Sequence, residues 1–157
     1  MFQNAIETRN DLLLYTSEPL DKPLFVTGPV RARLKVSINT PDTDVVLRIL
    51  DVDTAGNALL VQEGALRLRY REGFVQPKPL IPGEVYQVTV DLRDIAYLFE
   101  AGHRLRLHVA GSSFPRLERN LNTGGPNFSE TESRQAEISV HSDPANPSAL
   151  IVHAYTD

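Results

Sequence analysis

Cysteine and tryptophan are both absent from this chain of 157 residues. Without thiols the chain can form no disulfide, offers no thiolate ligand to a metal and has no cysteine nucleophile. It also lacks an apolar run near the ~20 residues that a membrane-spanning helix requires, and residues 1–10 lack the basic and then apolar order of a signal peptide. We therefore expect a soluble protein of the cytoplasm, with no membrane as a partner.

An excess of positive charge is missing as well. Sixteen Lys and Arg residues stand against 20 Asp and Glu residues, which gives a net charge of -4 with both signs mixed along the chain. Such a balance provides no basic footprint for nucleic acid and no cationic face for a membrane. The length predicts a single domain over residues 1–157, which at this size can bury roughly 68–70% of the surface that its unfolded chain exposes.

What the sequence does contain is a repeated alternation of apolar and polar residues, which is typical of half-buried β-strands. The clearest example lies in residues 29–39, whose apolar face holds Val30, Ala32, Leu34, Val36 and Ile38. Residues 45–52 are apolar on both faces except at Arg48, so we expect a strand in the middle of a sheet. Further strands are predicted at 12–16, 59–71, 86–92, 104–109, 136–140 and 150–154, and only residues 94–99 could form a turn of helix.

About eight such strands, with turns at roughly 8–12-residue spacing, predict an all-β fold, an antiparallel sandwich of two sheets. Residues 94–125 are the stretch around which the rest is organised. Within it Leu105, Leu107 and Val109 are expected to face the core, and Arg104, Arg106 and His108 the opposite side. Gly102 and Gly111 allow sharp turns at both ends of this strand, and an irregular, charged loop is predicted after Gly111.

Several short motifs of this stretch resemble a known family, the C-terminal non-catalytic domain of the Xaa-Pro dipeptidyl-peptidase group. That group includes the cocaine-esterase-like (CocE/NonD) acyl hydrolases and the α-amino acid ester hydrolases. The motifs are AGHRLRL at 101–107, GSSFPR at 111–116, Arg119-Asn120, LYTSEPL at 14–20 with TGPV at 27–30, and DTD at 42–44 with LDV at 50–52. The resemblance extends from about Glu7 to the end of the chain.

The resemblance implies a jelly roll of the galactose-binding-domain-like type. Relatives of this domain carry further N-terminal strands and, before them, a catalytic α/β-hydrolase domain, and neither is expected in this sequence. The resemblance also implies a role: such a domain packs on the hydrolase core, helps to wall the substrate pocket and mediates contacts between subunits.

No catalytic residue is expected in the chain itself. A serine hydrolase would carry G-x-S-x-G at a strand-to-helix turn, and the sequence contains no such string. Gly111-Ser112-Ser113-Phe114 lacks the second glycine, and the neighbours His141, Ser142 and Asp143 would point to opposite faces of a strand. No cofactor is implied.

Four aspartates, Asp42, Asp44, Asp51 and Asp53, are the best candidates for a metal site, because Ca²⁺ takes carboxylate oxygens. The two pairs flank a strand, however, and lie roughly 20 Å apart at ~3.3 Å per residue, so one ion cannot use both. We favour turn and strand-end roles, and no metal. For His103 we favour a hydrogen bond within a turn over a role in a pocket.

Six residues are the candidates for binding or for docking another domain: His103, Arg104, Phe114, Arg116, Arg119 and Asn120. The arginines among them, together with Arg106, could clamp a carboxylate. They could also tie the long loop to Glu100, Glu118 or the sheet, which we favour because the charges balance locally.

Two partners are expected, a serine hydrolase catalytic domain or chain, and a second copy of this chain. A homo-oligomer would use residues 1–15; alternatively, residues 1–10 fold back over their own strand edge and the chain stays monomeric. A free-standing carbohydrate-binding module is the rival function. The lack of Trp and the aromatic content of only 7% count against it, because sugar platforms need exposed rings.

Overall fold

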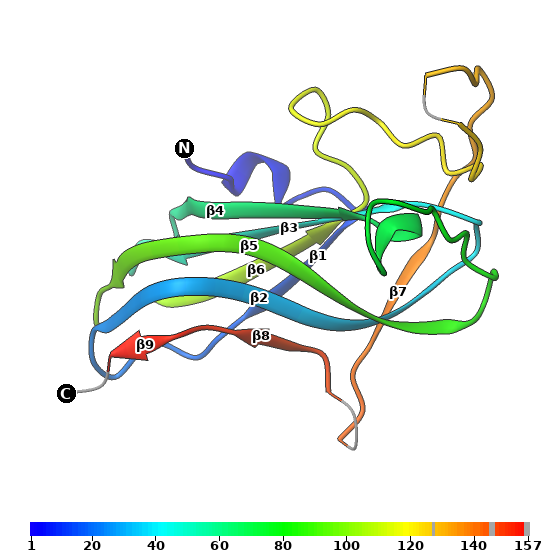
Figure 1. Ribbon diagram of the computed structural model, residues 1–157. Helices are drawn as coiled ribbons and strands as arrows, with labels where there is room; N and C mark the ends of the chain where they lie inside the picture. Colours follow the sequence, from blue (N-terminus) through cyan, green and yellow to red (C-terminus); the bar gives the residue numbers. More distant parts are fainter. Residues whose placement is uncertain (127, 145–146, 156–157) are drawn as a thin grey trace.

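The computed structural model describes residues 1–126, 128–144 and 147–155, and within them it contains nine strands and two short 3₁₀ turns (Figure 1). The strands are β1 (Leu12–Thr16), β2 (Leu24–Ile38), β3 (Asp44–Val52), β4 (Ala58–Arg67), β5 (Val85–Phe99), β6 (Arg104–Ala110), β7 (Ile138–His141), β8 (Ala149–Ile151) and β9 (Ala154–Tyr155), and the turns are η1 (Asn4–Ile6) and η2 (Leu68–Tyr70). No helix in the described part of the chain is long and apolar enough to cross a membrane.

The strands form two antiparallel sheets that pack face to face. The first sheet has the order β1-β6-β3-β4, and the second has the order β5-β2-β7, with β8 and β9 also paired to β2. The all-β, two-sheet antiparallel sandwich predicted from the sequence is therefore confirmed, and the finer jelly-roll assignment stays a prediction that this arrangement fits.

The core lies between the sheets and is built from the predicted faces. On β2 the five apolar positions of residues 30–38 are all buried, and Leu107 and Val109 of β6 face them from the first sheet. Their alternation with polar residues is the reason: only one face of each strand can leave water without burying unpaired polar groups.

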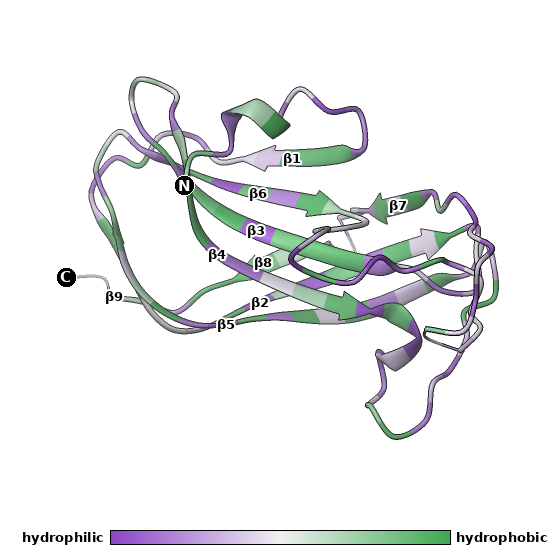
Figure 2. Cartoon of the chain, turned by 90° about the horizontal axis from the view of Figure 1, so that it is seen from above, coloured by the Kyte–Doolittle hydropathy of each residue, from purple (hydrophilic) through white to green (hydrophobic). Residues whose placement is uncertain are grey.

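The strand β3 is buried on both faces, as its sequence predicted. Val45, Leu47 and Ile49 join the core between the sheets, whereas Leu50 and Val52 form a second apolar cluster with Ala58 on the outer face of the first sheet. Figure 2 shows β3 in hydrophobic green over most of its length, with β6 and β4 as its neighbours.

The N-terminal residues cover part of this outer face. Gln3 N donates to Ala58 O at 2.8 Å, Leu60 N donates to Met1 O at 3.1 Å, and Phe2 forms a bridge with Leu59 at the edge of β4. The segment thus folds back on its own sheet, which is the geometry of the second alternative for residues 1–10.

Two sequence predictions of local structure are wrong. The strand expected at 59–71 ends at Arg67, because Leu68 turns inward to close the end of the core and its N–H donates to Thr43 O at 2.9 Å. The possible helical turn at 94–99 is instead the last part of β5, which pairs with the beginning of β2 from Leu24 to Pro29. At both places hydrogen bonds to distant segments determine the local structure, and the local sequence gives no sign of these bonds.

Candidate functional site

The long connection between β6 and β7 holds four of the six predicted site residues, Phe114, Arg116, Arg119 and Asn120. It rises on the outer side of the first sheet, the side that also carries the N-terminal segment (Figures 1 and 2). Loops of this length are uncommon in compact domains and are usually functional when they are ordered.

One anchor is the carboxylate of Glu63 on β4, whose side chain is only 4% exposed. Its Oε2 accepts hydrogen bonds from Arg48 Nε at 2.6 Å and from Ser113 Oγ at 3.0 Å, and its Oε1 accepts one from Arg116 Nη1 at 2.5 Å. Arg116 of the loop thus pairs with Glu63 of the sheet, and not with Glu100 or Glu118. This buried carboxylate fixes the beginning of the loop to β3 and β4.

A second anchor holds the middle of the loop. Asn120 Nδ2 donates to Asp42 Oδ2 at 2.9 Å and to Asp44 Oδ1 at 2.8 Å, so one amide joins both carboxylates. Asp42 is fully buried, which raises the pKa of its carboxyl, while hydrogen bonds from Asn120 and the Arg69 backbone oppose the rise. Arg67 pairs with Asp44 at 2.9 Å, and Arg69 Nη1 donates to Gly125 O at 2.5 Å. Asp42 and Asp44 therefore act as loop anchors.

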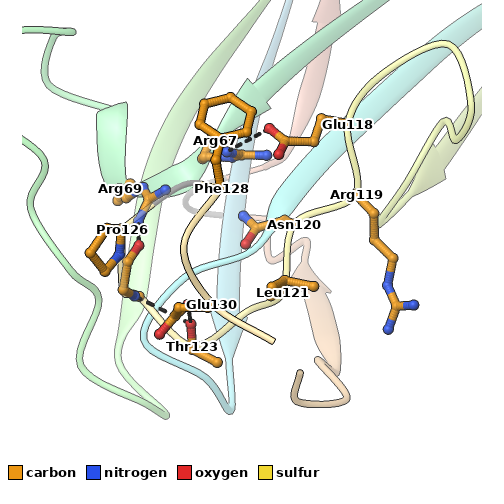
Figure 3. Close-up of a pocket in the computed structure, with 12 residues that line it drawn as sticks. Arg67, Arg69, Glu118, Arg119, Asn120, Leu121, Thr123, Pro126, Phe128 and Glu130 are labelled. Carbon is orange, nitrogen blue, oxygen red and sulfur yellow. Dashed lines mark hydrogen bonds and ion pairs between the residues drawn. The ribbon is translucent and has the colours of Figure 1, made fainter. Parts of the chain in front are cut away.

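A small cavity of about 130 Å³ lies beside the second anchor, with Asn120 in its lining (Figure 3). Its lining includes Arg67 and Arg69 from the end of β4 and from η2, and loop residues such as Glu118 and Phe128. Arg119 points away from the other labelled side chains, and its Nη2 donates to Ser133 Oγ at 3.2 Å. The cavity has the size of a few water molecules, and the charges around it are balanced locally.

The other two predicted site residues lie at the opposite end of β6. His103 Nδ1 lies 2.8 Å from Asp51 Oδ1, and Tyr97 Oη donates to Asp51 Oδ2 at 2.9 Å. Burial, together with the neighbouring Asp51, raises the pKa of Tyr97 to about 12. Arg104 Nη1 donates to Ser17 O at 2.9 Å. The fold thus does not bring His103 and Arg104 together with the loop residues.

The fourth aspartate, Asp53, lies in a turn. Its Oδ1 accepts hydrogen bonds from the Ala55 and Asn57 backbone at 2.9 and 2.8 Å, which is the bonding of a turn. Within residues 1–126, 128–144 and 147–155 there is no group of three or more His, Cys, Asp or Glu side chains placed to hold a metal ion.

A third charged group, which was not predicted from the sequence, lies between the N-terminal segment and β6. The carboxylate of Glu7 accepts hydrogen bonds from Arg106 Nη1 at 2.7 Å and from His108 Nε2 at 2.9 Å. His108 had been expected on the solvent-facing side of its strand, but it is fully buried, and its Nδ1 has no hydrogen-bond partner among the described residues. Burial raises the pKa of Glu7, but the hydrogen bonds from Arg106 and His108 outweigh it and leave the pKa below its ordinary value.

The group of Glu7, Arg106 and His108 predicts that the free energy of unfolding falls as the pH is lowered. Burial lowers the pKa of His108 below its ordinary 6.5 despite Glu7, and Arg48 and Arg106 also disfavour its charged form. Below pH ~6.5 the unfolded chain therefore takes up a proton that the folded chain does not, and stability is lost as the pH falls. At pH 5.5 the loss from this residue is at most about 1.4 kcal/mol.

Urea unfolding of the parent and of His108→Gln at pH 7.5 and 5.5 measures this loss. Glutamine can still donate to Glu7 but does not titrate, so the variant should lose less stability between the two pH values than the parent. Equal losses in the two proteins would show that His108 is charged in the folded state.

The fold and this site together define a class: a β-sandwich domain whose buried polar residues hold a long loop in place. Residues 1–151 match the family model described as the X-Pro dipeptidyl-peptidase C-terminal non-catalytic domain, and the chain belongs to this family.

Individual relatives agree with this assignment. The chain is 39% identical over 152 residues to the cocaine esterase of Rhodococcus sp. (strain MB1 Bresler), covering 96% of this chain and 26% of the esterase. It superposes with a TM-score of 0.93 on an aminopeptidase from a marine sediment Thaumarchaeota archaeon (32% identity, 99% of this chain, 27% of that one). The TM-score is also 0.93 for an α-amino acid ester hydrolase (30% identity, 98% and 27%). The chain thus spans about a quarter of the length of these relatives.

Proposed function

We propose that this chain serves as the accessory domain of a serine hydrolase, packing on its catalytic domain, supporting the shape of the substrate pocket and contributing to subunit contacts. The observation that supports this most is the match of nearly the whole chain, at a TM-score of 0.93, to about a quarter of an aminopeptidase and of an ester hydrolase, together with a family model described as a C-terminal domain. Peptide or ester hydrolysis would then belong to the complete enzyme. A cytoplasmic location stays an expectation from the sequence.

The contacts within the site favour a structural role over a catalytic one. Ser113 Oγ is engaged by Glu63 and Arg48, and Ser112 Oγ accepts from Phe114 N at 3.2 Å. A serine nucleophile needs a base within hydrogen-bond reach, and neither hydroxyl has a histidine as its partner. The six predicted site residues are therefore proposed as docking and loop-holding residues, not as catalytic ones.

Self-association is the second partner role that we propose. Residues 1–3 already occupy the edge of β4, whereas β1 pairs only with β6 in the described part of the chain. Leu13, Leu14 and Tyr15 on β1 are 41%, 40% and 46% exposed, and an uncovered apolar edge strand favours association. Within residues 1–15, β1 is therefore the segment expected in a homo-oligomer.

The rival function, carbohydrate binding, has one observation in its favour. Phe25 and Tyr155 lie side by side on the second sheet with ring centroids 6.4 Å apart, and they are 40% and 71% exposed. With Leu98 they line a hollow of about 710 Å³. Retention on immobilised polysaccharide that is lost in Tyr155→Ala would favour this rival.

The proposed function predicts that the chain alone hydrolyses neither Xaa-Pro dipeptide anilides nor aryl esters. It also predicts that the chain can replace the matching C-terminal quarter of the Rhodococcus cocaine esterase, giving a chimaera that is active and unfolds in a single transition. Turnover by the isolated chain that disappears in Ser112→Ala, Ser113→Ala or Ser142→Ala would contradict the first expectation. A chimaera that lacks activity and unfolds in two separate transitions would contradict the second.

A further inference from the structure

The long loop after β6 is bonded to the first sheet and its ends at several residues, yet it presents large apolar side chains to water. Phe114 is 71% exposed and Phe128 is 87% exposed. Close to them lie the buried anchors of the loop, Glu63 with its two arginines and Asn120 with its two aspartates. Ordering a loop costs conformational entropy, and burying ionised groups costs desolvation, so these anchors contribute a fixed shape more than stability.

Both phenylalanines lie on the outer side of the first sheet. Phe114 follows Ser113, which is bonded to Glu63 on that face of β4. Phe128 lines the same cavity as Arg67, which lies on the same face of β4, four residues from Glu63. In Figures 1 and 2 the loop and the N-terminal segment rise from this one side of the molecule.

The N-terminus brings further apolar surface to the same side. Met1 is 88% exposed and Phe2 is 63% exposed, beside the edge of β4. The family model describes this domain as C-terminal, and the matched part makes up 26–27% of the relatives' chains, so most of each relative is expected on its N-terminal side. A chain that precedes the domain, beginning with the further N-terminal strands expected in relatives, therefore joins it on the side that carries Phe2, Phe114 and Phe128.

We propose that the outer side of the first sheet, marked by Phe2, Phe114 and Phe128, is the surface that docks on the catalytic domain. The inference rests on the proposed function and names its interface. Aromatic side chains on a pre-ordered loop, with the 61% exposed Arg116 beside them, have the composition of interface anchors. A loop that is already anchored loses less freedom on binding, and the buried ion pairs that hold it supply this anchoring.

The opposite face of the sandwich has a different character. Along β2 the outward residues include Arg31 and Arg33, and Arg31 pairs with Asp91 at 3.7 Å, which is typical of a solvated sheet face. Its exposed Tyr155 lies on β9 of the second sheet and provides a matched comparison for the phenylalanines.

The chimaera with the Rhodococcus cocaine esterase tests the inference. Phe114→Ser with Phe128→Ser should shorten the half-life of its esterase activity at a fixed elevated temperature by about tenfold or more, because two interface anchors are lost. The control pair Phe74→Ser with Tyr155→Ser changes residues that are 82% and 71% exposed and should leave the half-life within twofold. In the isolated chain both double variants should have the same melting temperature as the parent.

The outcomes separate the two proposals. A parental chimaera without activity contradicts the proposed function itself. An active chimaera whose half-life is unchanged by Phe114→Ser with Phe128→Ser, or is shortened equally by the control pair, contradicts only the assignment of this surface.

Discussion

Leu107→Asp should destabilise the domain by about 4 kcal/mol or more, which is a large part of the stability of a typical single domain. Leu107 is 9% exposed and lies at the centre of β6, opposite Tyr15 of β1 and Ile49 of β3. Its side chain faces the core between the sheets, where the described residues that surround it are apolar. An aspartate there would be an ionised group without a partner, or would have to take up a proton to remain.

Urea unfolding followed by circular dichroism measures the loss. Thr89→Asp is the matched control, because Thr89 is exposed on β5 and pairs across the strands with Arg33, which can meet the new carboxylate. We expect the control to stay within about 0.5 kcal/mol of the parent. A Leu107→Asp protein that unfolds near the parental midpoint would mean that the faces of β6 are reversed.

The sequence was sufficient to predict the strands whose pattern is local. On β2 and β6 the apolar residues alternate with polar ones, so the buried face could be read directly, and β3 could be placed centrally because both of its faces are apolar. The same reading failed at Leu68, where a leucine in phase with the strand pattern instead closes the end of the core. Periodicity identifies a buried residue but does not say on which element it sits.

The candidate site was predicted only in part, for a related reason. Arg116 and Asn120 were found because they fall in recognisable motifs, but their partners are far away in the sequence, Glu63 on β4 and Asp42 between β2 and β3. The contact between Glu7 and His108 joins residues that are 101 positions apart in the sequence. A charged residue on a strand is equally compatible with solvent and with a buried pair, so a single sequence cannot distinguish the two.

The contact between β4 and β5 is a further feature that was not predicted from the sequence, although Gly64 lies at it. The strands belong to different sheets, and their contact closes one side of the sandwich. A Cβ atom at Gly64 would lie 2.4 Å from Asp91 O and 2.9 Å from Leu92 Cα. Glycine is therefore required here for close approach of two backbones.

Gly64→Ala should consequently destabilise the domain by about 3 kcal/mol, because backbone atoms, unlike the end of a flexible side chain, cannot move aside without disturbing both sheets. Gly111→Ala is the matched control, since its Cβ would meet only Ile138 Cδ1, at an ordinary 3.6 Å, and its backbone is not left-handed. The control should lie within about 0.5–1 kcal/mol of the parent, and could be the more stable protein because alanine restricts the unfolded chain. Thermal and urea unfolding of the three proteins decides the matter. If the two variants unfold together at the parental midpoint, β4 and β5 can separate without loss, and the closure of the sandwich on this side contributes nothing to its stability.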